Sequence, residues 1–340
     1  MAAFYVVISH GLPWVRQHIK LSGLLIPLLG NGPLAVALFF LLSGFLLSFT
    51  YKDNLSSTGS FVTFWVARLA RIYPVYLLSL LLALPFQLQL AFSARLAVLT
   101  TTQAWNPFHQ EWAGAWNYPA WSLSVETFFY VLFPLLQRGI FRLSNKGLLI
   151  LIAFTALACV VGHTAIQSIG ERYDFPAGSR FIVLPLVRLP EFVLGMSLGN
   201  HFLRGTNFLN CIYLTYISAT AALILLSFPI GSWVSLVVLP FAALIYGLAS
   251  SRSTLSVFLS ARIMVLLGGA SYSVYLLQAP FRDWVRTIAV YALGNKAALV
   301  TPLTPLLLVI FSIVVFKRFE EPLRKLIKGW WTPSRSSTQA

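Results

Sequence analysis

The chain contains 340 residues, of which 58% are hydrophobic and only 10% are charged, and its formal net charge is +15. Soluble globular domains carry about 25% charged residues, so this composition excludes an ordinary soluble domain. The excess of Lys and Arg does not indicate nucleic acid, because basic loops orient membrane proteins and attract anionic lipids. We therefore expect the lipid bilayer, and no nucleic acid, as a partner.

Apolar runs of spanning length recur along the whole chain, and a helix needs about 20 residues to cross the hydrocarbon core of a bilayer. The nine runs lie at roughly 33–51, 72–92, 120–137, 148–167, 181–203, 208–228, 232–250, 263–281 and 299–316. A tenth, at 1–9, is too short to cross alone, and a truncated gene model or a misassigned start codon would explain that. The sequence thus predicts an all-α, polytopic bundle of about ten transmembrane helices.

The orientation follows from the Lys and Arg residues, most of which fall in one set of alternate loops. Basic loops stay on the cytoplasmic side. We therefore expect both termini in the cytoplasm, the loop 93–119 outside, and a location in the cytoplasmic (inner) membrane. One transmembrane domain, 1–328, is expected to precede a disordered cytoplasmic tail at 329–340, which is rich in Ser and Thr.

Two features of the N-terminal apolar stretches are candidates for function, His10 and the pair Ser43-Gly44. His10 stands at the outer end of its span, where it suits a general base acting on a hydroxyl. An interfacial histidine bonded to a loop carbonyl is the alternative. A Ser-Gly pair permits close approach of another helix or of a ligand.

Arg68 and Arg71 stand at the cytoplasmic end of the third span, three residues apart and hence on one helix face. Paired guanidinium groups match the oxygens of a phosphate-bearing ligand. An ordinary positive-inside anchor accounts for them equally well. The long loop that follows carries Trp105, Trp112 and Trp116, which fit either an interfacial aromatic belt or a platform for stacking sugars.

The carboxylate of Glu126 lies inside an apolar run, where an ionised side chain costs about 2.5–3.5 kcal/mol at the helix centre. Such a residue usually faces a protein interior or a wet cavity. Ser122 is four residues earlier and therefore shares its helix face, with Tyr130 below. We expect this face to border a functional cavity.

Two further spans carry polar side chains. Arg188 and Glu191 are one turn apart and predict a structural ion pair. Ser271, Tyr275 and Gln278 share one helix face, as expected for the wall of a cavity.

The order of these motifs resembles the acyltransferase 3 family of membrane O-acyltransferases. The resemblance extends from about residue 2 to 325. It rests on His10, 39–45, 68–74, 121–130, 188–195, 271–276 and Glu321-Pro322.

The resemblance implies transfer of an acyl group, commonly acetyl from acetyl-CoA, to a hydroxyl of a cell-surface glycan or related acceptor. The essential histidine of the family maps to His10, its serine and glutamate segment to Ser122, Ser124 and Glu126, and its arginines to Arg68 and Arg71. Family members usually carry an arginine upstream of the histidine, before the start of this chain. They often carry histidine where Gln278 stands, and glutamine is able only to hydrogen-bond there.

The residues and the resemblance together permit the following mechanism. Acyl-CoA is the cosubstrate, and Arg68 and Arg71 hold its phosphates. His10, oriented by Glu126 or another acceptor, removes the proton from the hydroxyl that attacks the thioester. The candidates for supporting that reaction or donating to the oxyanion are Ser43, Ser122, Ser124 and Tyr275.

Direct transfer and a covalent acyl-enzyme are both compatible with these residues. No bound cofactor and no metal are expected, because no residues show metal-ligand spacing. The competing interpretation is a transporter or flippase in which Glu126, Arg188 and Glu191 couple ions or gate substrate. The sequence shows no inverted repeat that would favour it.

Overall fold

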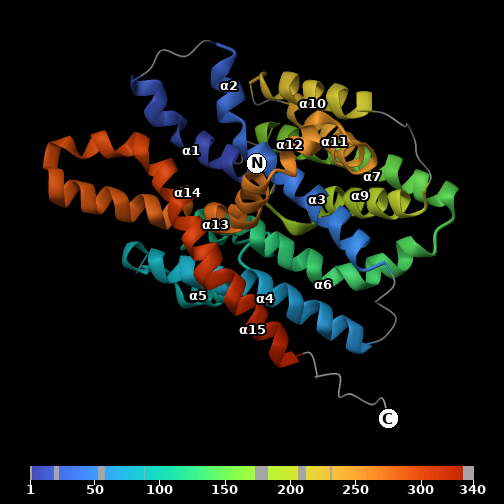
Figure 1. The fold of residues 1–340 in the computed structure, drawn as a ribbon, viewed down its shortest axis with the longest axis horizontal. Coiled ribbons are helices and arrows are strands. Elements are labelled where there is room, and N and C mark those ends of the chain that lie inside the picture. The colour runs from blue at the N-terminus through green and yellow to red at the C-terminus, as the bar shows by residue number, and fades with distance from the viewer. Residues whose placement is uncertain are drawn as a thin grey trace.

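The computed structural model describes residues 2–18, 23–52, 58–87, 89–172, 183–205, 212–229 and 232–331, and the regular structure within them is entirely helical (Figure 1). The helices are α1 (Ala2–His18), α2 (Leu25–Gly30), α3 (Ala35–Thr50), α4 (Thr58–Ala83), α5 (Phe92–Leu99), α6 (Trp121–Phe141), α7 (Asn145–Arg172), α9 (Pro185–Leu203), α10 (Ile212–Leu226), α11 (Val238–Ser250), α12 (Thr254–Leu259), α13 (Arg262–Leu293), α14 (Thr304–Val315) and α15 (Glu321–Trp331). The predicted all-α class is confirmed. Most of the expected outer loop 168–180 and residues 332–340 of the expected tail lie outside the described residues.

Six helical stretches in the described part of the chain are long and apolar enough to cross a membrane. They are Gly32–Thr50, Gly59–Phe86, Tyr118–Phe141, Asn145–Ile166, Arg262–Leu293 and Lys296–Trp331. The expected runs at 208–228 and 232–250 form the shorter apolar helices α10 and α11. The prediction of a polytopic helical membrane protein is therefore confirmed.

Helix α4 begins well before the apolar run at 72–92 that predicted it. It starts at Thr58, so Arg68 and Arg71 lie within the helix rather than at its end. Residues 61–71 are mostly apolar, with polar side chains only at Thr63, Arg68 and Arg71, and Phe64 among them is fully buried. Burial of such side chains extends the helix beyond the apolar run that predicted it.

Helices α3 and α9 pack with their backbones in close contact, and glycines make that approach possible. A Cβ atom at Gly44 would lie 2.1 Å from the Phe192 carbonyl oxygen, and one at Gly195 would lie 2.0 Å from the Leu41 carbonyl oxygen. Small residues of this kind let membrane helices approach closely. The helix-packing interpretation of Ser43-Gly44 is therefore confirmed, and Gly195 supplies the matching surface on α9.

The core consists of two clusters of buried apolar side chains that share α3. One cluster joins α3 to α4, α6, α9 and α13, and the other joins it to α9, α10 and α11. In the first, the Phe129 ring of α6 lies 5.2 Å from the Phe40 ring and is stacked on the Phe192 ring at 4.7 Å. This packing fixes α6 between α3 and α9.

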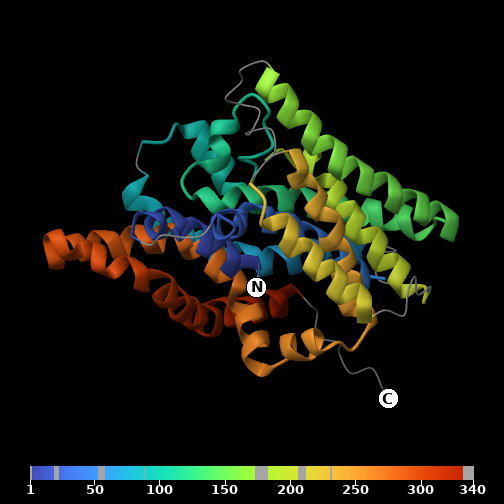
Figure 2. The same cartoon turned by 90° about the horizontal axis from the view of Figure 1, so that it is seen from above.

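Helices α13 and α14 are neighbours that project together beyond the rest of the bundle, at the left of both ribbon views (Figures 1 and 2). Helix α13 also packs against α1 and α4. A π-helical turn, Phe316–Glu320, joins α14 to α15, and α15 then packs along α4. The C-terminal helix thus returns to the part of the bundle that holds Arg68 and Arg71.

Candidate active site

A cavity of about 240 Å³ lies among α3, α4, α6 and α13. It brings together polar residues that are far apart in the sequence. Those that line it are Ser43, Arg68, Arg71, Ser122, Glu126, Tyr130, Ser271, Tyr272 and Tyr275. The carboxylate of Glu126 therefore faces a cavity, as predicted from the free-energy cost of an ionised side chain within an apolar span.

The carboxylate of Glu126 is held by two hydroxyl groups. Oε1 accepts a hydrogen bond from Ser43 Oγ at 3.1 Å and another from the Tyr130 hydroxyl, one turn further along α6. Hydroxyl donors replace part of the hydration that a carboxylate loses inside a protein. The hydrogens of Ser43 and Tyr130 are thereby directed to Glu126 and not into the cavity.

Ser122 and Tyr275 form a second pair in the cavity wall. Their hydroxyl oxygens are 2.8 Å apart, and Ser122 Oγ also lies 3.1 Å from the Pro119 carbonyl oxygen. When Ser122 donates to Tyr275, the phenol hydrogen of Tyr275 is left to point into the cavity. Of the oxyanion candidates, Tyr275 is then the one whose donor hydrogen is available.

Ser124 does not line the cavity. Its hydroxyl, which is fully buried, accepts a hydrogen bond of 3.1 Å from the backbone N–H of Ala104, and its carbonyl accepts one of 2.9 Å from the Trp105 indole. A second indole, that of Trp116, donates to the Leu80 carbonyl at 2.9 Å. Ser124 therefore fixes the loop 93–119 to α6, and these two tryptophans hold the loop against the bundle.

His10 lies outside the residues that line the cavity, and its ring partner is Gln278 rather than Glu126. The Nδ1 atom is 2.9 Å from Gln278 Oε1, while Gln278 Nε2 donates to the Tyr275 carbonyl at 2.8 Å. An amide oxygen only accepts, so Nδ1 carries the proton and neutral His10 presents an unprotonated Nε2. That tautomer suits a general base. Gln278 is one turn beyond Tyr275, which links His10 to the cavity wall.

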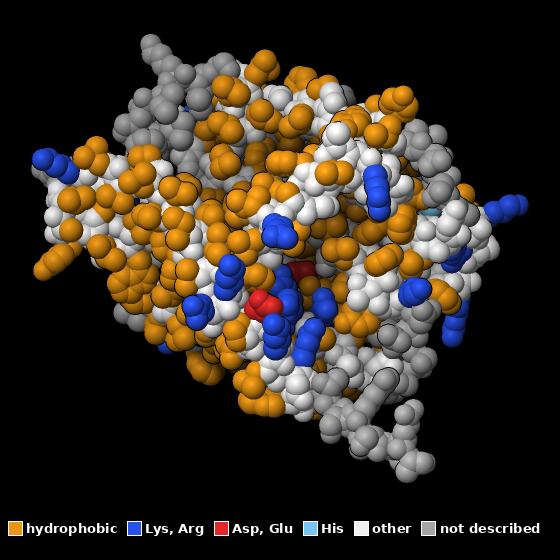
Figure 3. Space-filling model, viewed as in Figure 1, with side chains coloured by type: hydrophobic (Ala, Val, Ile, Leu, Met, Phe, Trp, Pro, Cys, Tyr) orange, Lys and Arg blue, Asp and Glu red, His pale blue; other side chains and the backbone are white. Residues whose placement is uncertain are grey.

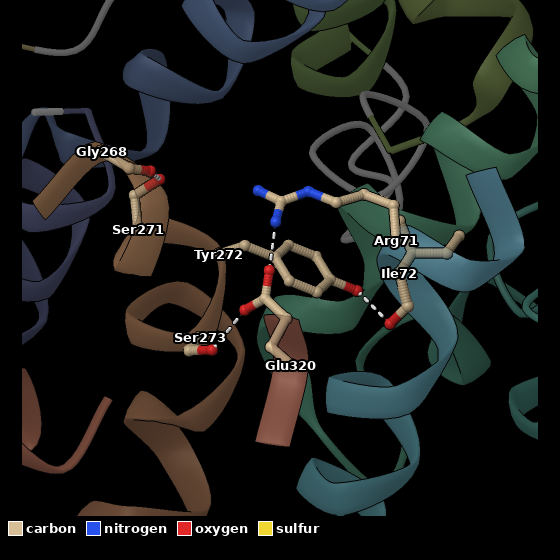
Figure 4. Close-up of polar contacts among 7 residues, drawn as sticks. All are labelled: Arg71, Ile72, Gly268, Ser271, Tyr272, Ser273 and Glu320. Atoms are coloured by element: carbon tan, nitrogen blue, oxygen red, sulfur yellow. Dashed lines mark hydrogen bonds and ion pairs between the residues drawn. The ribbon is translucent and has the colours of Figure 1, made fainter. Parts of the chain in front are cut away.

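The two arginines of α4 line the cavity and are held by different partners. Arg68 donates to the Tyr51 hydroxyl at 3.3 Å, and its guanidinium lies 5.8 Å from the centre of the Phe64 ring. Arg71 forms an ion pair with Glu320 and lies 5.5 Å from the centre of the Tyr272 ring (Figure 4). Both guanidinium groups are therefore oriented before any ligand binds.

Glu320 is a polar residue of the site that the sequence did not identify. It is fully buried, and Ser273 Oγ donates to its Oε2 at 2.7 Å while Arg71 pairs with Oε1 (Figure 4). Glu126 is marked by the apolar run that surrounds it, whereas Glu320 follows Lys317 and Arg318 just after an apolar run, so the sequence gives no comparable signal for it.

Arg188 and Glu191 form the expected ion pair, with an N–O distance of 2.7 Å. Both side chains are buried, and the Arg188 guanidinium lies 5.6 Å from the Phe40 ring and 5.9 Å from the Trp121 ring. Neither residue lines the cavity. The pair is positioned to join α9 to α3 and α6 beside the site.

Positive charge gathers at the mouth of the cavity. Figure 3 shows Lys and Arg side chains around a hollow on this face, with acidic side chains near its centre. Lys328 of α15 lies within the electrostatic reach of Arg68, Arg71 and Arg324. The site therefore combines a basic mouth and an inner group of hydroxyls around a carboxylate, and Gln278 links its wall to a histidine outside the cavity.

Comparison with known proteins supports the same chemistry. The model of an acyltransferase domain family, acyltransferase 3, matches residues 1–316. The acyltransferase MdmB of Streptomyces mycarofaciens is 31% identical, over 72% of this chain and 67% of MdmB. The O-acetyltransferase OatA of Staphylococcus aureus is 25% identical, over 87% of this chain and 53% of OatA, so the chain spans about half the length of that relative. No solved structure matches.

The family match covers nearly the whole chain and includes every residue of the cavity. The resemblance inferred from the order of motifs is therefore confirmed, and the protein is an enzyme that transfers acyl groups other than aminoacyl groups. The chain belongs to the acyltransferase 3 family.

Proposed function

We propose that this protein is an O-acyltransferase of the cytoplasmic membrane that transfers an acyl group, with acetyl as the first candidate, from acyl-CoA to a hydroxyl of a cell-surface glycan or related acceptor. Both termini lie in the cytoplasm in this proposal, so acyl-CoA enters at the basic mouth. The observation that carries the proposal is one continuous cavity in which Arg68 and Arg71 stand at the same site as Glu126 and Tyr275.

The donor binds with its phosphates near Arg68 and Arg71 and its thioester in the cavity. Guanidinium groups suit this role because their planar forks match phosphate oxygens. The acceptor hydroxyl approaches His10, whose Nε2 takes its proton while Nδ1 stays bonded to Gln278. Tyr118, which is 62% exposed and whose ring lies 6.5 Å from the His10 ring, borders this approach.

In this proposal the acyl group passes directly from the sulfur of the donor to the oxygen of the acceptor. The acceptor oxygen forms a bond to the thioester carbonyl carbon, and the oxyanion that develops receives a hydrogen bond from Tyr275. The carbon–sulfur bond then breaks, and the proton held by His10 passes to the leaving thiolate. The products are an ester and free CoA. Glu126 orients Ser43 and Tyr130 and keeps this wall of the cavity polar.

The test is acyl transfer in membranes that contain the protein, with radiolabelled acetyl-CoA as donor and native cell-envelope glycans as acceptors. The proposal predicts label in the glycan fraction that mild base releases, because oxygen esters hydrolyse under those conditions. Membranes without the protein are the control. Absence of base-labile label with properly inserted protein and several acyl-CoA donors would contradict the proposed donor and acceptor classes.

A further inference from the structure

Helix α13 carries a row of polar side chains that begins in the cavity and continues past the histidine. Tyr275 lines the cavity, and the Gln278 side chain, three residues later, lies 2.9 Å from Nδ1 of His10. Arg282 is four residues beyond Gln278, so it shares that helix face and lies about 6 Å further along the axis. Helix α1, which carries His10, packs against α13. The row therefore places an arginine next to the histidine.

The guanidinium group of Arg282 is close to His10 and open to a ligand. It acts electrostatically on the His10 ring, and the Arg282 side chain is 57% exposed. Its Nε atom lies 3.7 Å from Oδ1 of Asp283, which is too long for a hydrogen bond. Within the described part of the chain, its terminal nitrogens donate no hydrogen bond. The planar fork of donors at the end of Arg282 is therefore available to an anion.

A rigidly held aromatic ring stands on another side of His10. The Tyr118 ring is 62% exposed, lies 6.5 Å from the His10 ring, and acts electrostatically on Tyr275. The preceding residue, Asn117, is buried, and its Nδ2 donates to the Leu276 carbonyl of α13 at 3.0 Å. This bond fixes the end of the loop and hence the position of Tyr118. A fixed tyrosine offers a large amphipathic contact surface at little cost in conformational entropy.

We infer that Arg282 and Tyr118 form an acceptor subsite beside His10 that binds a carboxylate-bearing sugar. This inference rests on the proposed function, in which the acceptor hydroxyl approaches Nε2 of His10. One guanidinium group pairs through two hydrogen bonds with one carboxylate. The neighbouring Asp283 limits the net positive charge here, which favours a monoanion over a doubly charged phosphate. Because Arg282 is one helical turn past Gln278, the carboxylate lies on the acylated sugar or on the next sugar.

The experiment measures acetyl transfer as a function of glycan concentration, in membranes with equal amounts of inserted protein and saturating radiolabelled acetyl-CoA. The acceptors are native cell-envelope glycans, either intact or with their carboxylates converted to neutral methylamides, which adds no hydroxyl group. Arg282→Gln is compared with wild type. Arg286→Gln is the matched control, because Arg286 is an exposed arginine one turn further along α13.

We expect Arg282→Gln to raise the KM for intact glycan about tenfold with little change in kcat, because it removes a charge-assisted bond to a non-reacting part of the acceptor. Arg286→Gln should stay within about twofold of wild type. Amidation should raise the wild-type KM by a similar factor to Arg282→Gln. It should add no further loss in Arg282→Gln, because both changes remove the same interaction.

The outcomes separate the inference from the proposed function. Wild-type transfer that is unaffected by amidation overturns the carboxylate subsite and leaves the acyltransferase proposal standing. An equal rise in KM for Arg286→Gln assigns the effect to general positive charge and also overturns it. Base-labile label on neither glycan contradicts the proposed function itself, and the inference falls with it.

Two further measurements guard against an indirect effect. Arg282→Lys keeps the charge but loses the planar fork, so its KM should lie between those of wild type and Arg282→Gln. A fall in kcat without a rise in KM in Arg282→Gln would mean that the arginine acts on His10 and not on the acceptor, which refutes the subsite. If Arg282→Gln does not insert, the amidation experiment on the wild-type protein still decides.

Discussion

The substitution Gly195→Ala tests whether backbone contact between α3 and α9 positions the site. The new Cβ would lie 2.0 Å from the Leu41 carbonyl oxygen, against the 3.0 Å below which real Cβ contacts essentially never fall. The Cβ position is fixed by the backbone of α9 and the oxygen belongs to the backbone of α3, so no side-chain rotation relieves the clash. The two helices would have to separate by about 1 Å, in an interior packed too tightly to absorb that movement.

The expected cost is about 3 kcal/mol, near the upper end for overpacking a core, because backbone atoms clash. Replacing glycine with alanine within a helix returns about 1 kcal/mol. The net destabilisation is therefore about 2 kcal/mol. Leu41 is two residues before Ser43, so the displacement also weakens the 3.1 Å hydrogen bond between Ser43 and Glu126, and acyl transfer should fall with stability.

The assay is thermal unfolding of the detergent-solubilised protein, followed by size-exclusion chromatography, together with transfer activity in membranes. Gly162→Ala is the matched control, because Gly162 lies inside α7 and a Cβ there meets nothing within 4 Å. We expect Gly195→Ala to melt below wild type and Gly162→Ala to melt at or above it. A Gly195→Ala protein as stable and active as wild type would refute the close backbone packing.

Three further predictions concern the polar contacts of the site. Glu320→Gln should lower the free energy of unfolding by about 1.5–3 kcal/mol, because Arg71 loses a charged partner. Denaturant unfolding measures this change, and an unchanged free energy of unfolding would contradict the importance of the ion pair. Tyr275→Phe should lower kcat about 10²–10³-fold with little change in the KM for acyl-CoA, and a wild-type kcat would exclude it as oxyanion donor. Gln278→Leu should lower the transfer rate about tenfold or more, because Nδ1 of His10 loses its acceptor, whereas Gln278→Glu should retain activity. Equal rates for the two Gln278 variants would contradict the orienting role.

Local patterns in the sequence were sufficient to place Glu126. A carboxylate inside an apolar run predicts a cavity, and helical spacing places Tyr130 one turn below it, where its hydroxyl does donate to Glu126. Helical geometry also separates Ser122 from Ser124, because residues two apart point to opposite sides of a helix. The family motif groups the two serines, but only Ser122 lines the cavity.

Local sequence patterns could not predict contacts between residues that are far apart in the sequence. Gln278 is 268 residues from His10, and Glu320 is 249 residues from Arg71, so no periodicity connects either pair. The direction in which Glu320 points depends on the π-helical turn Phe316–Glu320, which rotates α15 relative to α14. The bundle's packing, and not the local sequence, decides these contacts.

The central claim is that the membrane domain transfers an acyl group with His10 as general base. The most direct measurement compares base-labile acetyl label on envelope glycans in membranes containing wild type, His10→Ala or His109→Ala, at equal amounts of inserted protein. His109 is an exposed histidine of the loop 93–119 and serves as the matched control. We expect a loss of transfer of at least about 100-fold for His10→Ala and near-normal transfer for His109→Ala. Near-normal transfer by folded His10→Ala protein would contradict the claim.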